Sequence, residues 1–164
     1  MLTIILEMST NRQGRRTQKG EKMLRNIPQI ISPELLKILM EMGHSDVIVL
    51  ADANYPAASG AKRLIRADGT DVTVLLDAVL RFFPLDTFVT HPAVLMAPLP
   101  DSPTPPIWSE FRNIISHHDK EKAFTDFQLI DRFDFYEYAR KAYAIVQTGT
   151  TAHYANIALI KGVL

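Results

Sequence analysis

The segment 41–56, EMGHSDVIVLADANYP, places an imidazole and two carboxylates around a short apolar run. His44 and Asp46 precede the run, and Asp52 follows it. Histidine suits proton transfer, because its unperturbed pKa of ~6.5 lets it give and take a proton near neutral pH. A strand rises about 3.3 Å per residue, so Asp46 and Asp52 lie roughly 20 Å apart and do not form an acid/base couple.

The same strand separates His44 from Asp52. Asp52 follows the carboxyl end of an apparently central strand, where α/β sheets usually open onto ligands. We expect the two side chains to meet only if the chain folds unusually or a neighbouring subunit brings one to the other. The simpler alternative is that Asp52 caps a turn and His44 caps the preceding helix.

A second polar group lies near the carboxyl terminus, in RFDFYEY and HYANIALIKG. Arg132, Tyr136, Tyr154 and Asn156 are placed there beside apolar segments. Arg and Asn donate hydrogen bonds in fixed geometries, and Tyr both donates and accepts. This set suits a polyol better than an acyl or phosphoryl group. The alternative is ordinary surface aromatics and an asparagine at a strand edge.

Motifs for cofactor and metal chemistry are missing from the sequence. It has no GxGxxG, P-loop, HExxH or GxSxG pattern. It also has no cysteine, which excludes disulfides, thiolate nucleophiles and Cys-ligated zinc. His117-His118-Asp119 ends a predicted helix, where histidine is favourable to the helix dipole. We therefore expect no cofactor and no metal site.

Composition indicates one globular domain with no membrane or nucleic-acid partner. The 164 residues are 47% hydrophobic, with 18 basic and 18 acidic side chains. No apolar run reaches the ~18 residues of a membrane span, so we expect a cytoplasmic protein. Residues 9–22 show no apolar periodicity, and residues 1–22 carry five basic against two acidic side chains. We predict a disordered N-terminal extension, 1–22, and a domain, 23–164.

The elements that must position these groups alternate along the chain. Ser32 and Pro33 predict the start of a helix that ends at Gly43. Residues 46–52 are apolar on both faces, which predicts a central strand. This pattern predicts a single layered α/β domain with a central sheet flanked by helices. The other predicted helices are about 71–83, 107–119 and 134–142, and the other strands are 93–97, 127–130, 143–148 and 155–161, with a stiff proline-rich loop at 98–106.

Four segments of the chain belong together: SPELLKILMEMGHSDVIVLADANYP, LIRADGTDVTVLLDAVL, IDRFDFYEYARKAYAIVQTG and HYANIALIKGVL. Taken together they resemble the RbsD/FucU family, and the L-fucose mutarotase branch more closely than the ribose branch. The resemblance runs in order from Met23 to Leu164. It implies an α/β subunit that assembles into rings, commonly decamers, with cofactor-free sugar sites close to subunit boundaries.

The resemblance also implies roles for single residues. His44 matches the family's catalytic histidine, the proton donor. Tyr136 matches a position lining the same site. The matches to sugar-binding positions are Asp52, Arg132, Tyr154 and Asn156.

The expected activity is interconversion of the α and β anomers of L-fucose or a close relative. Ala155 departs from the glycine that the fucose branch tends to carry and is more like the ribose branch. Arg132 and Tyr136, in contrast, differ from what look like His and Lys in the ribose branch. A D-ribose pyranase, a non-catalytic sugar-binding module and a ring-forming scaffold are the alternatives.

Overall fold

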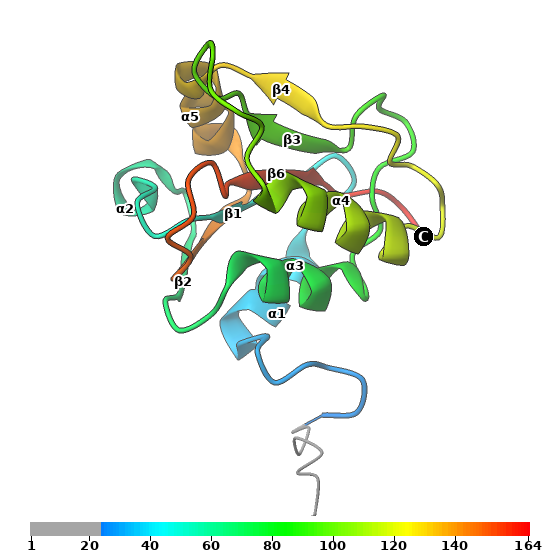
Figure 1. Ribbon diagram of the computed structural model, residues 1–164. Helices are drawn as coiled ribbons and strands as arrows, with labels where there is room; N and C mark the ends of the chain where they lie inside the picture. Colours follow the sequence, from blue (N-terminus) through cyan, green and yellow to red (C-terminus); the bar gives the residue numbers. More distant parts are fainter. Residues whose placement is uncertain (1–23) are drawn as a thin grey trace, which may run out of the picture.

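The computed structural model describes residues 24–164; the extension predicted at 1–22 lies outside these residues. Helices and strands alternate along the described chain, except that the last two strands follow one another without a helix between them (Figure 1). The helices are α1 (Pro33–Glu41), α2 (Ala57–Gly60), α3 (Val72–Leu80), α4 (Ile107–His118) and α5 (Arg132–Lys141). The strands are β1 (Val47–Ala51), β2 (Leu64–Ala67), β3 (Ala93–Met96), β4 (Gln128–Ile130), β5 (Ala144–Thr148) and β6 (Ile157–Ile160).

The strands form one mixed six-stranded sheet in the order β2-β5-β1-β6-β3-β4. β1 lies inside the sheet, parallel to β5 and antiparallel to β6, so the predicted central strand is confirmed. β6 is also antiparallel to β3, whereas β2 and β4 are parallel to their neighbours. The carboxyl ends of five strands and the amino end of β6 therefore share one edge, which we call the carboxyl edge.

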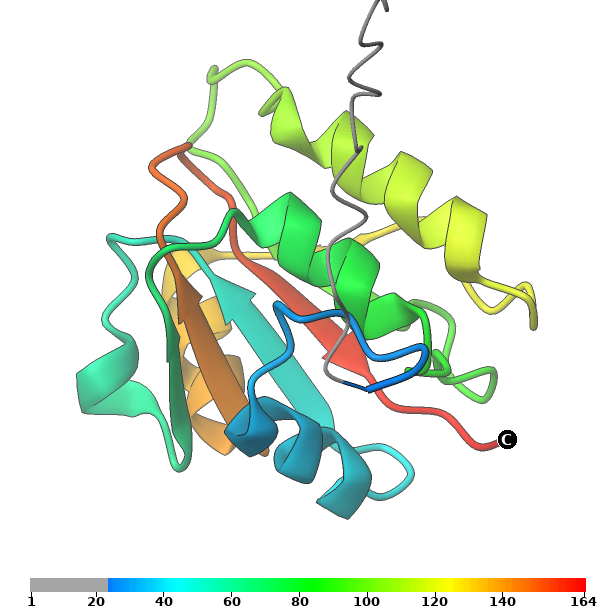
Figure 2. The ribbon, with the colours of Figure 1, turned by 90° about the horizontal axis from the view of Figure 1, so that it is seen from below.

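Helices cover both faces of the sheet. Figures 1 and 2 show α1, α3 and α4 on one face and α5 on the other. The side chains of β1 alternate accordingly: Ile48 and Leu50 join the core under α1, α3 and α4, while Val49 and Ala51 join the core under α5. The predicted α/β domain with a central sheet flanked by helices is confirmed.

Local chemistry explains where the helices begin. The Ser32 hydroxyl accepts a hydrogen bond from the backbone N–H of Leu35 at 3.1 Å, which caps α1 in front of Pro33. In α5 the helix begins two residues before the predicted start. The extended backbone of Asp131 forms the N-cap, and its carbonyl accepts a hydrogen bond from the N–H of Phe135 at 2.8 Å.

The sequence did not predict α2 and β2. The small residues of α2 carry no apolar periodicity. β2 is an edge strand in which exposed positions alternate with half-buried ones. None of the helices in the described chain is long and apolar enough to cross a lipid bilayer.

A close backbone approach fixes the segment that precedes Asp86. The N–H of Gly162 donates to the carbonyl of Pro84 at 2.9 Å, and the N–H of Asp86 donates to the carbonyl of Ile160 at 3.1 Å. A Cβ atom on Gly162 would lie 2.4 Å from the carbonyl oxygen of Leu85, so a glycine is required there. Asp86 is thereby held at the edge of the sheet where β1 begins.

Candidate functional site

Asp52 and Asn156 form a buried pair at the carboxyl edge. Asn156 Oδ1 accepts a hydrogen bond from the backbone N–H of Asp52 at 2.9 Å, and its Nδ2 donates to Asp52 Oδ2 at 2.8 Å. The two residues are only 6% and 4% exposed. They meet because β1 ends where the antiparallel β6 begins. The pair joins residues 104 positions apart into one rigid polar unit.

The second oxygen of Asp52 organises the loop after β1. The backbone N–H of Asn54 donates to Asp52 Oδ1 at 2.9 Å, which is an Asx turn. The predicted turn-capping role of Asp52 is therefore present, together with the contact to Asn156. Burial raises the pKa of Asp52 above its ordinary 3.8, and the hydrogen bonds from Asn54 and Asn156 oppose that change.

Tyr154 lies just before β6 in a left-handed backbone conformation, with φ of 56°. Its carbonyl oxygen accepts a hydrogen bond from the indole N–H of Trp108 at 3.1 Å. Its phenol oxygen accepts one from the backbone N–H of Leu99 at 3.3 Å. Tyr154 thus links the proline-rich loop and α4 to the start of β6, beside Asn156.

Arg132 and Tyr136 reach the same edge from α5, which begins directly after β4. The guanidinium of Arg132 lies 4.8 Å from the ring centre of the exposed Phe133. Tyr136 makes an edge contact with Tyr55 at 5.5 Å between ring centres. Burial, with the neighbouring Tyr136 as a further cause, raises the pKa of Tyr55 to about 12. Tyr136 and Tyr154 both pack against the apolar cluster under α5.

His44 lies at the opposite edge, in the turn between α1 and β1. The backbone N–H of Gly43 donates to Asp46 Oδ2 at 2.7 Å, and Ser45 has φ of 67°, so the tight turn is fixed independently of the imidazole. His44 Nε2 lies 3.2 Å from both carboxylate oxygens of Asp86. The imidazole therefore contacts Asp86 rather than capping α1.

One chain thus collects five of the six predicted residues at the carboxyl edge and leaves His44 at the other. Carboxylate, amide, guanidinium and phenol groups together can bind several hydroxyl groups in fixed orientations. An imidazole backed by a carboxylate can exchange protons.

A family model described as the RbsD / FucU transport protein family matches residues 25–164. The chain belongs to this family. The resemblance carried by the four sequence segments is therefore confirmed.

Two proteins similar to this chain are named fucose mutarotases, from Mus musculus and Homo sapiens. They are 46% and 45% identical over 148 residues, which is 86% of this chain and 95% and 94% of theirs. A solved structure of the fucose mutarotase from Streptococcus pneumoniae, in complex with L-fucose, is 50% identical. It superposes with a TM-score of 0.81 over 86% of this chain and 99% of that one.

The sequence reasoning missed Asp86, the partner of His44. The sequence does carry a signal for it: Asp86 directly follows the apolar residues FFPL, and a carboxylate in apolar surroundings needs a polar partner. In this member of the RbsD/FucU family Asp86 is fully buried.

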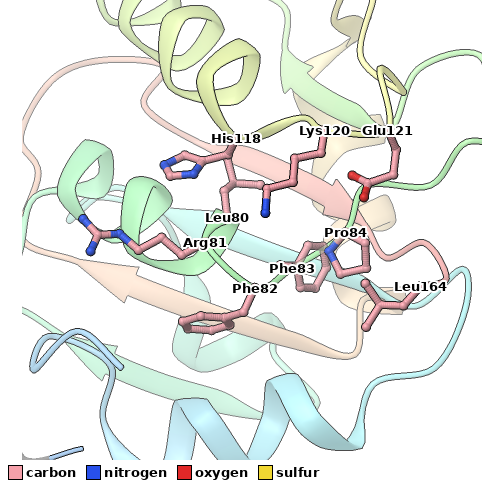
Figure 3. A pocket seen from close by; sticks show the side chains of 9 residues that line it. All are labelled: Leu80, Arg81, Phe82, Phe83, Pro84, His118, Lys120, Glu121 and Leu164. Atoms are coloured by element: carbon pink, nitrogen blue, oxygen red, sulfur yellow. The ribbon is translucent and has the colours of Figure 1, made fainter. Parts of the chain in front are cut away.

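A cleft of about 190 Å³ lies after α3, around Phe82, Phe83 and Pro84. Figure 3 shows Glu121 and Leu164 on either side of Pro84. The cleft is lined by none of the six predicted site residues. Among residues 24–164, no three His, Asp or Glu side chains are grouped as a metal site requires.

Proposed function

We propose that this protein is a cofactor-free mutarotase that interconverts the α and β anomers of L-fucose or a closely related sugar. The observation that carries the proposal is the 50% identity, over 86% of the chain, to a fucose mutarotase crystallised with L-fucose. An enzyme of this kind is an isomerase, and its substrate and product differ only in configuration at one carbon.

The carboxyl edge supports the proposal by its chemistry. Asp52 is fixed by Asn156 and Asn54, so its carboxylate is oriented before a sugar arrives. Arg132 is exposed and Tyr136 and Tyr154 are half-buried, which leaves donors and acceptors within reach of a ligand. We assign Asp52, Arg132, Tyr136, Tyr154 and Asn156 to sugar binding. Hydroxyl groups are recognised well by such fixed donors and acceptors, because unpaired polar groups in a site cost free energy.

The reaction needs only proton transfers. One proton leaves the anomeric hydroxyl and one reaches the ring oxygen as the bond between that oxygen and the anomeric carbon breaks. The open aldehyde then rotates about its bond to C2 and closes on the other face, and the protons return. We assign His44 to this transfer, because an imidazole gives and takes protons near neutral pH.

Assembly supplies the proximity that a single chain lacks. His44 and the pair of Asp52 and Asn156 lie at opposite ends of β1. We propose that His44 of one subunit faces the carboxyl edge of another in a ring, which the family resemblance suggests is a decamer. The absence of cysteine fits a reducing compartment, and we place the enzyme in the cytoplasm.

Magnetisation-exchange NMR on equilibrated L-fucose tests the activity. The protein should speed the exchange between α and β signals, and His44→Ala should abolish this acceleration. His117→Ala is a matched control, because His117 is an exposed histidine at the end of α4. An unchanged exchange rate with the intact protein would refute the proposal. Loss of activity in His117→Ala as well would refute the specific role of His44.

Mixed assemblies test the shared site. His44→Ala and Arg132→Ala are each expected to be inactive, and both substituted side chains are exposed. Co-expressed chains should recover activity, because some sites then combine an intact His44 with an intact Arg132 from different subunits. Mixed rings that are no more active than the separate variants would contradict the shared site. Sedimentation velocity measures the size of the assembly.

A non-catalytic sugar-binding module is the second candidate, because the family description refers to transport. Such a module would keep its affinity for L-fucose in His44→Ala and lose it in Arg132→Ala. D-ribose belongs in the same NMR experiment, since Ala155 resembles the ribose branch. Faster pyranose–furanose exchange of ribose, with fucose unaffected, would assign the protein as a pyranase.

A further inference from the structure

We propose that Asp86 is a positioning residue that holds His44 in one tautomer, with the proton on Nε2, so that Nδ1 is the atom that exchanges protons with the sugar. The contact between Asp86 and His44 is a property of the chain alone. The part that concerns the sugar rests on the proposed function.

The contact geometry determines which nitrogen carries the proton. Nε2 of His44 lies 3.2 Å from both oxygens of Asp86, so the imidazole edge faces the whole carboxylate. A carboxylate only accepts hydrogen bonds, and a neutral imidazole has one donor and one acceptor nitrogen. Nε2 must therefore donate. The remaining lone pair of the neutral ring is then on Nδ1.

Asp86 is itself immobilised. It is 0% exposed, and its Oδ1 accepts a hydrogen bond from the backbone N–H of Phe88 at 2.9 Å. Its own N–H is bonded to the carbonyl of Ile160, and the glycine at 162 keeps the preceding backbone close. A buried carboxylate is costly without a partner, so rotation of the imidazole away from Asp86 is disfavoured.

Phe88 restricts the imidazole from another side. Its ring makes an edge contact with the ring of His44, with centres 5.4 Å apart and planes at 61°. Both contacts come from the single loop that follows Leu85. The loop therefore sets the direction in which the imidazole points.

The other edge of the imidazole is free to receive a ligand. Within residues 24–164, Nδ1 of His44 makes no hydrogen bond, and the His44 side chain is 44% exposed. A proton gained at Nδ1 gives an imidazolium whose second N–H still faces Asp86. The carboxylate thus supports the charged ring while Nδ1 alone gives and takes the proton.

Nitrogen NMR reads the tautomer directly. The protein would be labelled with ¹⁵N-histidine, and the signals of His44 assigned by their loss in His44→Ala. At a pH where the ring is neutral, we expect an N–H type resonance for Nε2 and a bare-nitrogen resonance for Nδ1. A proton on Nδ1, or a mixture of tautomers, in the intact protein would overturn the proposal whether or not any variant folds.

Asp86→Asn tests the consequence. The amide oxygen keeps the hydrogen bond from Phe88, which turns the amide NH₂ toward Nε2 and favours a proton on Nδ1. General acid–base catalysis is worth about 10²–10⁴-fold, so kcat for fucose exchange should fall by that factor. KM should change less than about threefold, because no sugar-binding group is altered. A fall in kcat of less than about tenfold, with the tautomer changed, would contradict the assignment.

Asp77→Asn is the matched control. Asp77 Oδ1 also bonds a histidine, His118, at 2.8 Å between α3 and α4. The same substitution there should leave both the His44 spectrum and kcat unchanged, and an equal loss of kcat would overturn the proposal. If the intact protein does not speed fucose exchange, the proposed function fails, while the tautomer spectrum still decides the role of Asp86.

Discussion

Asn156→Ala should destabilise the protein strongly, because it removes both hydrogen bonds of a buried pair. The backbone N–H and the Oδ2 of Asp52 would each lose a partner in a region that is almost closed to solvent. An unsatisfied buried polar group costs about 1–3 kcal/mol. Two such groups, partly relieved by local rearrangement, give an expected loss of about 3 kcal/mol in the free energy of unfolding.

Urea unfolding followed by tryptophan fluorescence measures this loss. Trp108 is the only tryptophan of the sequence, and its indole bonds the carbonyl of Tyr154, two residues before Asn156. With a slope of about 2 kcal/mol per M, the midpoint should fall by about 1.5 M. Protein concentration must be equal in all samples, because assembly shifts apparent stability.

Asn113→Ala is the matched control, since Asn113 is exposed on α4 and alanine is the better helix former. It should change stability by only a few tenths of a kcal/mol. A double-mutant cycle with Asp52→Ala should give a coupling energy of about 1–3 kcal/mol. A loss below about 1 kcal/mol for Asn156→Ala, or additive effects in the cycle, would refute the reasoning.

Three further outcomes are expected. Gly162→Ala should cost about 1–3 kcal/mol in urea unfolding and slow fucose exchange, because the new Cβ displaces the backbone before Asp86. Phe111→Ala should cost about 3–5 kcal/mol, because its fully buried ring leaves a cavity. Hydrogen bonds from His118 and then Arg81 lower the pKa of Asp77 below 3.8. Asp77→Asn should therefore cost less than ~1 kcal/mol near neutral pH. In acid unfolding this difference should decrease as the pH falls below 3.8 and be lost once the pH is below the lowered pKa of Asp77.

Local signals predicted most of the elements. Ser32 and Pro33 define the start of α1, and the unbroken apolar run of β1 reflects its place inside the sheet. β2 was missed because it is a four-residue edge strand, LIRA, in which no position is buried and exposed positions alternate with half-buried ones. The sequence pattern also cannot show that β6 runs antiparallel between β1 and β3, because that depends on pairing across the whole chain.

The site was predictable in its residue types and only partly in its geometry. The position of Asp52 after an apolar strand located the carboxyl edge in advance. Its pairing with Asn156 depends on a contact across 104 residues, and the pairing of His44 with Asp86 on one across 42. Neither contact can be read from the spacing of apolar and polar residues along the sequence. The roles assigned to these residues in a sugar site stay predictions until the variants are measured.

The position of β6 has a consequence during protein synthesis. Among the six strands of the sheet it is the last to leave the ribosome, yet it separates the β2-β5-β1 half from the β3-β4 half. Until it emerges, β1 and β3 each present an unpaired edge, which is a template for aggregation. A chain truncated before Ile157 lacks β6 and should therefore be retained by chaperones or degraded. Only chains that include β6 should then accumulate in the folded state.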